Sequence, residues 1–182
     1  MAHTDFANMP CPVARSMAML GERWAILLMR EVYYGSSRFD EFEKHLGIAP
    51  NILSARLKTL VEHGLLDKVP APGGGARQVY RLTEMGRDFF PVYVSLKAWA
   101  DRWLSDEKGP LTTLEDKRDG KEIVAGQLTR ADGSAIAVDD LRVRPGPGAG
   151  RYLRARFGDE PGDGAGDGPG DPSTAKAAHA QS

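Results

Sequence analysis

Residues 38–69 decide the fold: they read RFDEFEKHLGIAPNILSARLKTLVEHGLLDKV, which predicts a helix, a sharp turn, a second helix and a strand. Gly47 is expected to close the first helix, because glycine readily adopts the left-handed conformation that ends many helices. Pro50 is expected to open the second, where the N–H that proline lacks would have had no partner anyway. The second helix places its apolar residues on one side, at helical spacing. They are Leu53, Leu57, Leu60 and Val61.

The flanks of this stretch predict further elements. Helices are expected over 12–20 and 22–33, and the second of them carries Trp24 and Leu28 on one face. Strands over 65–69 and 78–82 enclose the glycine-rich segment PAPGGGA, which predicts a β-hairpin. A long helix over 83–104, interrupted near Pro91, carries more aromatic surface than a domain of this size needs.

Composition divides the chain into three regions. Residues 1–105 are periodic and rich in large apolar side chains, residues 106–147 read as short strands and turns, and residues 148–182 are mostly Gly, Asp, Pro and Ala. The last region has too little to bury to offset the entropy cost of folding. We therefore expect a mainly α fold with a β-hairpin wing (α+β), a small β-rich extension over 106–147 and a disordered tail over 148–182.

Charge and composition exclude several classes of protein. The net charge is -1, but residues 1–105 hold 13 Lys and Arg against 11 Asp and Glu, so the front is mildly basic. The longest apolar run, 24–29, is far shorter than the roughly 20 residues that span a bilayer. With one cysteine, neither an internal disulfide nor a multi-cysteine zinc site can form. We expect a cytoplasmic protein without membrane contact, cofactor, metal or enzymatic activity.

The second helix of the opening stretch has the chemistry of a DNA-reading element. An α-helix fits the major groove, where Asn pairs with adenine, Ser donates or accepts, and Ala touches the thymine methyl. Its N-terminal turns do the reading, and basic residues around it hold phosphates. The candidate DNA-binding residues are Pro50, Asn51, Ser54, Ala55, Arg56 and Lys58 on this helix, Arg38 on the preceding one, and Lys68, Arg77 and Arg81 on the hairpin. Taken alone, such a face is usually just solvated.

The order of short motifs resembles a known family. CPV, GERWAILL, RFDEF, LGI, LSARLKTLVEHGLL, VYRLTEMG and a late KAW follow one another over residues 11–104. This succession is similar to that of the HxlR family, winged helix-turn-helix transcription regulators related to the MarR type. The resemblance implies a homodimer that binds a pseudo-palindromic operator and is built from the first and last helices of the domain. Ala49 departs from the family, which usually has a Ser-like cap before the proline.

The resemblance extends into the second region. Some longer family members carry a small β-rich extension with cysteine knuckles and a tail similar to LRVRPGPG, which this chain keeps at residues 141–148. Asp119-Gly120 and Asp132-Gly133 stand where the knuckle turns would fall, but without cysteines. We hypothesise a zinc-free descendant made of hairpins with Asp-Gly turns.

The sequence offers two candidate regulatory sites, each with an alternative interpretation. Cys11 precedes a helix, a position that can activate a thiol, and in the family such a cysteine serves some members as a sensor of oxidants or electrophiles. The alternative is a small residue buried at the dimer interface. Trp24, Tyr93 and Trp99 are candidates to line a pocket for a small-molecule effector, and the alternative for them is core packing.

The sequence as a whole predicts a DNA-binding transcription regulator. We expect a repressor that binds a double-stranded operator as a homodimer, with recognition helices about 34 Å apart, and that responds to a small molecule or to oxidants. The alternative is a winged-helix module that binds other proteins without sequence-specific DNA binding.

Overall fold

A computed structural model describes residues 5–73, 77–107, 109–123, 125–126 and 128–158. The chain divides into two compact units, Met1–Ile136 and Ala137–Ser182. This boundary falls inside the extension that we expected over 106–147, so the hairpins of the extension belong to the first unit.

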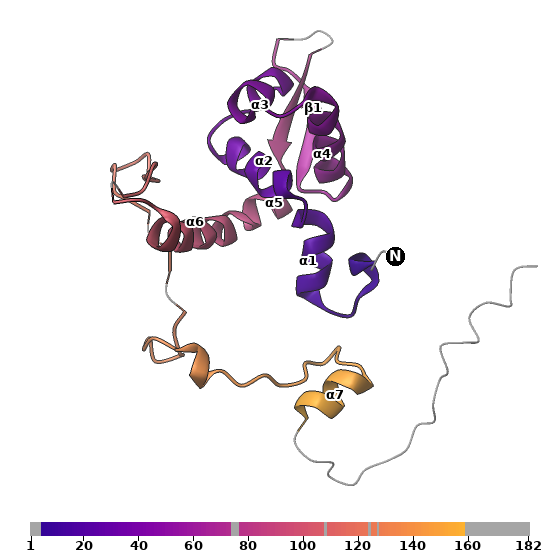
Figure 1. Ribbon diagram of the computed structural model, residues 1–182, viewed down its shortest axis with the longest axis vertical. Helices are drawn as coiled ribbons and strands as arrows, with labels where there is room; N and C mark the ends of the chain where they lie inside the picture. The colour runs from indigo at the N-terminus through magenta and orange to yellow at the C-terminus, as the bar shows by residue number, and fades with distance from the viewer. Residues whose placement is uncertain (1–4, 74–76, 108, 124, 127, 159–182) are drawn as a thin grey trace, which may run out of the picture. The chain divides into compact units, whose positions relative to one another are not determined.

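The order of elements in the first unit is the one that the sequence predicts (Figure 1). The helices are η1 (Phe6–Asn8), α1 (Pro12–Leu20), α2 (Arg23–Tyr33), α3 (Phe39–Leu46), α4 (Pro50–Glu62), α5 (Glu84–Asp88) and α6 (Phe90–Leu104), and the strands are β1 (Leu66–Pro70) and β2 (Gln78–Leu82). Helix α1 has the expected bounds, α2 begins one residue later than expected, and Pro50 begins α4 as predicted. The predicted winged helix-turn-helix fold is thereby confirmed.

The core lies where α2, α3 and α4 meet the base of the hairpin. Leu28, Phe42, Leu53 and Leu57 are fully buried there. Each comes from an apolar stripe at helical spacing, so burying the stripes fixes how the three helices pack. Residues that contact this cluster from its edge include Trp24.

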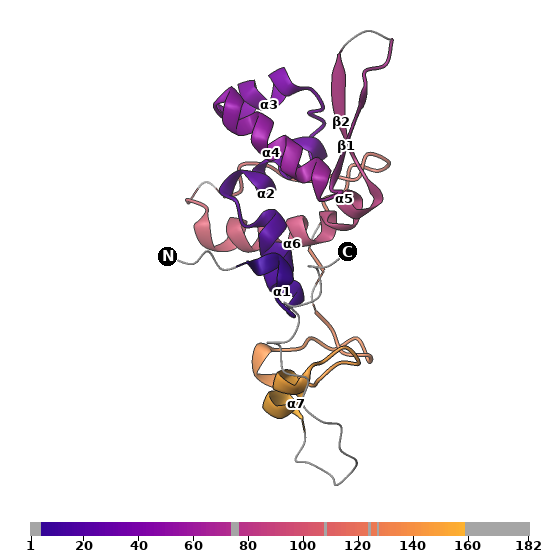
Figure 2. The same ribbon diagram turned by 90° about the vertical axis from the view of Figure 1, so that its right-hand side faces the viewer.

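The two strands form the wing. They pair antiparallel, with Lys68 opposite Tyr80 and Asp67 opposite Arg81. Figures 1 and 2 both show the hairpin reaching beyond the helices, next to α3 and α4. The backbone N–H of Tyr80 donates to the carbonyl of Ser37 at 2.7 Å, so the loop before α3 is hydrogen-bonded to the edge of β2.

The predicted interruption near Pro91 divides the last helix into α5 and α6. Phe89 both ends α5 and precedes α6, and Pro91 lies in the first turn of α6, where its missing N–H is tolerated. Gly86 in α5 sits so close to the residue before β1 that a Cβ there would lie 2.2 Å from the carbonyl oxygen of Leu65. Glycine is required at this position because the backbones approach too closely for a side chain.

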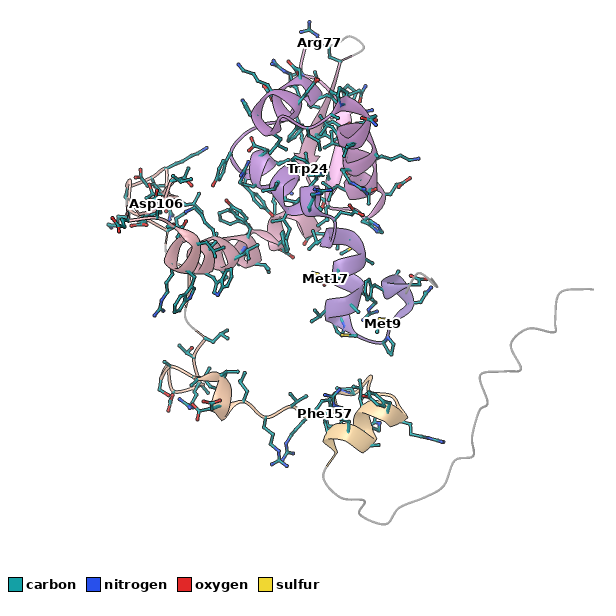
Figure 3. All side chains as sticks on the ribbon, viewed as in Figure 1. Met9, Met17, Trp24, Arg77, Asp106 and Phe157 are labelled. Atoms are coloured by element: carbon teal, nitrogen blue, oxygen red, sulfur yellow. The ribbon has the colours of Figure 1, made fainter. Side chains whose placement is uncertain are left out.

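Two helices present apolar side chains to solvent. Along α1 and the turn before it these are Phe6, Met9, Val13 and Met17, and along α6 they are Val92, Leu96, Trp99, Trp103 and Leu104. Figure 3 shows Met9 and Met17 lying away from the winged-helix body that holds Trp24. Contiguous exposed apolar surface is typical of interaction sites.

The extension forms two small hairpins rather than full strands. Isolated bridges pair Glu115 with Glu122 and Thr129 with Ala135. The chain turns at Gly120 and Gly133, whose φ angles of 69° and 82° suit the expected Asp-Gly turns. Most side chains here are exposed, so little apolar burial is available to lengthen the strands. In the part of the chain that is described, no three His, Cys, Asp or Glu side chains gather as a metal site would require.

The second unit holds η2 (Val138–Asp140) and α7 (Arg151–Phe157). The expected disordered tail began at residue 148, so α7 corrects the start of that segment. The sequence RYLRARF has large side chains and good helix formers, unlike the Gly-, Asp- and Pro-rich run that follows. Residues 159–182, the rest of the expected tail, lie outside the described residues. None of the described helices is long and apolar enough to cross a membrane.

Candidate DNA interface

Helix α4 separates its buried side from its outward side. Leu53, Leu57 and Leu60 are buried in the core, whereas Pro50, Asn51, Ser54, Ala55 and Lys58 are exposed. The exposed positions fall in the first three turns on one face of the helix. Five of the six α4 residues predicted to contact DNA are thus available to a partner.

The turn before α4 fixes where its N-terminus points. Gly47 caps α3 with a φ of 60°, the left-handed conformation that the sequence predicted. Ile48 then buries its side chain in the core, and Pro50 starts α4 after Ala49, which offers no hydroxyl or carboxylate to cap the helix. The turn is therefore held by a buried residue, and the N–H groups at the start of α4 can donate to a phosphate oxygen.

Arg56 does not join the outward face. Its Nη2 lies 3.0 Å from the Glu22 carboxylate at the start of α2, and its side chain is about one-third exposed. The sequence predicted that Arg56 would hold a phosphate, but the structure directs its guanidinium to Glu22. No local pattern predicts this pair, because the two residues are more than 30 positions apart in the sequence.

Arg38 lies at the entrance to α3 among acidic neighbours. Its guanidinium pairs with Asp40 at 3.1 Å and with Glu41 at 3.3 Å. A hydrogen bond from Arg38 holds the pKa of Asp40 below its usual range. The Glu41 carboxylate also accepts from the backbone N–H groups of Ser37 and Arg38, at 2.8 and 2.9 Å, and these bonds lower the pKa of Glu41. The carboxylates stabilise the start of α3 and hold Arg38 in place.

The wing carries three cations in different settings. Arg77 and Arg81 are exposed, and Figure 3 shows Arg77 at the far end of the hairpin. Lys68 instead lies over the ring of Tyr80, with its Nζ 5.9 Å from the ring centroid. Tyr80 in turn meets Phe42 edge to face, with 6.0 Å between the centroids, and burial raises its pKa. This stack sets the wing against α3.

The structure brings Arg38 and Arg77 together although 38 residues separate them. Both line one hollow of about 610 Å³ between the start of α3 and the wing, with Phe39, Asp40 and Gln78. Arginine side chains suit a phosphate group, and Asp40, which pairs with Arg38, lines the same hollow.

A buried polar cluster joins α2 to α3. Glu31 is buried; one carboxylate oxygen accepts from Arg30 at 2.7 Å, and the other accepts from the Ser36 hydroxyl at 3.2 Å and lies 3.2 Å from Nδ1 of His45. The cluster fixes the loop that carries Arg38 and pairs with the wing. Sequence reasoning missed it, although a glutamate between Leu28 and Val32 on an apolar helical face was a usable signal.

The predicted effector residues do not gather around one cavity. A cavity of about 590 Å³ opens between α2, α6 and the segment around Thr112. Among the described residues Tyr93 lines it, but Trp24 and Trp99 do not: Trp24 packs against the core, and Trp99 is 55% exposed on α6. Spacing along separate helices could not show which way these rings turn.

The cavity has a polar centre of tyrosines. The hydroxyls of Tyr34 and Tyr93 lie 2.8 Å apart, and the Tyr34 hydroxyl is 3.3 Å from Oγ1 of Thr112. Burial is the main cause that raises the pKa of Tyr93, and the hydrogen bond with Tyr34 adds to it. The Tyr93 hydroxyl therefore stays protonated near neutral pH and can donate to a bound oxygen.

Cys11 lies at the N-terminus of α1 and is half-buried. It immediately precedes Pro12, the first residue of α1. This is the predicted position relative to the helix, and it tests neither the sensor hypothesis nor its alternative.

A helix-turn-helix whose second helix exposes Asn and Ser, flanked by a hairpin with arginines, defines a winged helix-turn-helix DNA-binding protein. Residues 19–108 match the family described as HxlR-like helix-turn-helix. The chain belongs to this family of transcription regulators, as its sequence motifs predicted.

Relatives support this assignment along most of the chain. The uncharacterized HTH-type transcriptional regulator Rv3095 of Mycobacterium tuberculosis is 38% identical over 136 residues, which are 75% of this chain and 86% of that protein. The HTH-type transcriptional regulator YodB of Bacillus subtilis is 30% identical over 112 residues, or 60% of this chain and 98% of YodB. The solved structure of PA1607, a candidate transcription factor, superimposes with a TM-score of 0.72 at 39% identity and covers 77% of this chain and 98% of its own.

Proposed function

We propose that this DNA-binding regulator represses transcription by binding a pseudo-palindromic operator near its target promoter as a homodimer. The observation that carries the proposal is α4, which buries its leucines and exposes Asn51, Ser54 and Ala55 in its first turns. These three side chains are the ones that can reach base edges when the helix enters the major groove.

The chemistry of each side chain on this surface determines whether it can contact a base or a phosphate. Asn51 can pair bidentately with adenine, and such a pair discriminates against other bases by about 1–3 kcal/mol. Lys58, which is exposed one turn further along α4 and lies 3.6 Å from the Glu62 carboxylate, can hold a phosphate. Arg38, Arg77 and Arg81 surround the helix and can grip the backbone on either side.

The exposed apolar faces of α1 and α6 support a homodimer. Trp99 and Trp103 are 55% and 63% exposed, and Val13 is 68% exposed. A second copy would remove this surface from water at about 25 cal/mol per Å² of apolar area. A dimer with two-fold symmetry would place two α4 helices in successive major grooves, about 34 Å apart, which requires a palindromic operator.

The cavity around Tyr93 is the candidate effector site. It adjoins α2, which carries Glu31 and so is tied to α3, and it adjoins α6, which offers the dimer surface. A ligand that moves α2 and α6 apart would change the distance between the two α4 helices of the dimer. A compound with an oxygen acceptor and an apolar body fits the Tyr34 and Tyr93 hydroxyls and the apolar wall.

Gel shifts with the DNA upstream of the gene test the proposal. We expect a discrete complex with the wild type, loss of operator preference in Asn51→Ala with Ser54→Ala, and weaker binding in Arg77→Ala. Arg87, an exposed arginine on α5, gives the matched control Arg87→Ala, which should bind as the wild type does. Equal binding to a scrambled duplex by the wild type would refute an operator-specific regulator.

Repression and redox response have tests of their own. Deleting the gene should raise transcription from its target promoter, and a fall would instead show an activator.

Diamide should abolish operator binding by the wild type and spare Cys11→Ser if Cys11 is the sensor. Equal loss of binding in both proteins would remove Cys11 from the proposal.

A further inference from the structure

A strongly basic segment lies outside the winged helix, in the unit that begins at Ala137. Residues 141–158, here called the arginine arm, read LRVRPGPGAGRYLRARFG and contain five arginines but no Asp, Glu or Lys. All five arginines are exposed. They are Arg142, Arg144, Arg151, Arg154 and Arg156. Two aspartates, Asp139 and Asp140, precede the arm, so five positive charges stand against two negative ones over residues 137–158.

The backbone of the arm presents the arginines in two groups. Pro145 and Pro147 restrict the residues before them to extended conformations, so Arg144 lies on an extended segment. The second group lies on α7, a helix of seven residues. Arg154 folds back from this helix, and its guanidinium donates to the carbonyls of Ala149 at 2.8 Å and of Pro147 at 3.3 Å. These bonds tie α7 to the proline-containing segment and keep the two groups close.

Aromatic residues support the arginine at the end of α7. The guanidinium of Arg156 lies over the Phe157 ring at 4.7 Å, and its Nη1 is 3.4 Å from the Tyr152 hydroxyl. A guanidinium stacked on a ring keeps its N–H edge free to bind a phosphate in a fixed direction. Tyr152 is itself 70% exposed and can donate its hydroxyl to a phosphate oxygen.

We infer that the arginine arm is a second DNA-binding element, which grips the phosphate backbone of duplex DNA beside the site read by the winged helix. Its function is independent of sequence, since arginines without a recognition helix neutralise phosphates on any duplex. The inference extends the proposed operator binding and rests on it for the location of the second contact.

Duplex DNA is the partner that the observations favour. The arm is covalently joined to a DNA-binding domain, so once the winged helix has bound, the arm meets the adjacent duplex at an effective concentration in the millimolar range. Each arginine that neutralises a phosphate releases counterions, which makes the affinity depend steeply on salt.

The test measures how the affinity of the full chain depends on salt between about 50 and 200 mM. The duplexes carry the operator, or a scrambled sequence, with flanks on both sides. In the arm variant all five arginines become glutamine: Arg142→Gln, Arg144→Gln, Arg151→Gln, Arg154→Gln and Arg156→Gln. We expect the slope of log K against log salt to become shallower by up to about 4.5 per subunit, and by at least about 2. Five Arg→Lys changes keep the charge and should restore the slope even if α7 is perturbed.

A matched control removes cations that lie among acids. Residues 115–122 carry four acidic and three basic side chains, and Arg118 and Lys121 pair there with Asp116 and Asp119. Changing Lys117, Arg118, Lys121 and Arg130 to glutamine should alter the slope by less than about one unit. An equal effect of this control would show a general charge effect and overturn the inference.

Three further results would overturn the inference as well. The first is an arm variant whose slope of log K against log salt equals that of the wild type. The second is a loss of slope that the Arg→Lys version does not restore. The third is an arm variant that binds duplex DNA as the wild type does but no longer binds single-stranded RNA or anionic vesicles. The proposed operator recognition fails separately: it is measured by the ratio of affinities for operator and scrambled duplex. The arm variant should leave that ratio unchanged. If the wild type binds both duplexes equally, the salt dependence measured on the scrambled duplex still tests the arm.

Discussion

Thr83 joins the turn between α4 and β1 to α5, and replacing it by valine tests how the wing is held. Its hydroxyl donates to the Gly64 carbonyl in that turn at 2.6 Å and accepts from the Gly86 N–H at 3.0 Å, in the first turn of α5. Valine has the same shape but can make neither bond. Losing the helix cap costs about 1 kcal/mol. Leaving a partly buried carbonyl without its donor costs about 1 kcal/mol more, so we expect Thr83→Val to lower the free energy of unfolding by about 2 kcal/mol.

The matched control is Thr59→Val on α4. The Thr59 hydroxyl donates to the Ala55 carbonyl at 3.0 Å, at an exposed position, so its loss should change stability by less than about 0.5 kcal/mol. Urea unfolding at one fixed protein concentration measures both, and the m value should stay constant. An effect of Thr83→Val no larger than that of Thr59→Val would refute the view that this hydroxyl joins the turn between α4 and β1 to α5.

Three further predictions concern packing, an ion pair and pH. Gly86→Ala should lower stability by about 1–3 kcal/mol, because its Cβ meets a backbone oxygen at 2.2 Å, whereas Gly126→Ala, which has open space, should be nearly neutral in the same urea titration. Arg56→Ala and Glu22→Gln should each lower the free energy of unfolding by about 1 kcal/mol or less, and the two losses should not add in the double variant. Arg56→Ala should leave the salt dependence of DNA binding unchanged, whereas a shallower dependence would make Arg56 a phosphate contact. Hydrogen bonds lower the pKa of Glu41 in the folded state, so the ionised carboxylate stabilises the fold above its unfolded-state pKa, and this stabilisation is lost as the pH falls through its folded-state pKa. Glu41→Gln should therefore be less stable than the wild type near neutral pH and equally stable in acid.

Local signals predicted most of the fold. Gly47 and Pro50 mark the turn between α3 and α4 because each has a backbone property that other residues lack. The leucines of α4 repeat at helical spacing, so their burial follows from the sequence. Pro91 marked the break between α5 and α6 for the same kind of reason.

The site could be predicted in part. Asn51, Ser54, Ala55 and Lys58 are exposed on one face because that face lies opposite the leucines. The partners of Arg56 and Glu31 could not be predicted, since the residues that contact them belong to other helices, and the directions of those side chains depend on tertiary packing. The same limit explains the error at the aromatic residues. Trp24 and Trp99 lie on apolar helical faces, but one face meets the core and the other meets solvent.

The extension and the tail differ from expectation for a reason of composition. Asp-Gly turns are strong local signals, and the chain turns at Gly120 and Gly133 as expected. The strands beside them remain single bridges because few apolar residues flank the turns. Helix α7 was missed because RYLRARF is short and stands beside a run that suggests disorder.

The central claim is that the outward face of α4 reads a specific operator. Fluorescence anisotropy tests it most directly, with the upstream DNA and a scrambled duplex of equal length titrated with the wild type and with Asn51→Ala plus Ser54→Ala. We predict that the wild type binds its upstream DNA at least about a hundredfold more tightly, and that the variant keeps its fold and its affinity for the scrambled duplex but loses most of this preference. A variant that still prefers the upstream DNA as strongly as the wild type would contradict the claim.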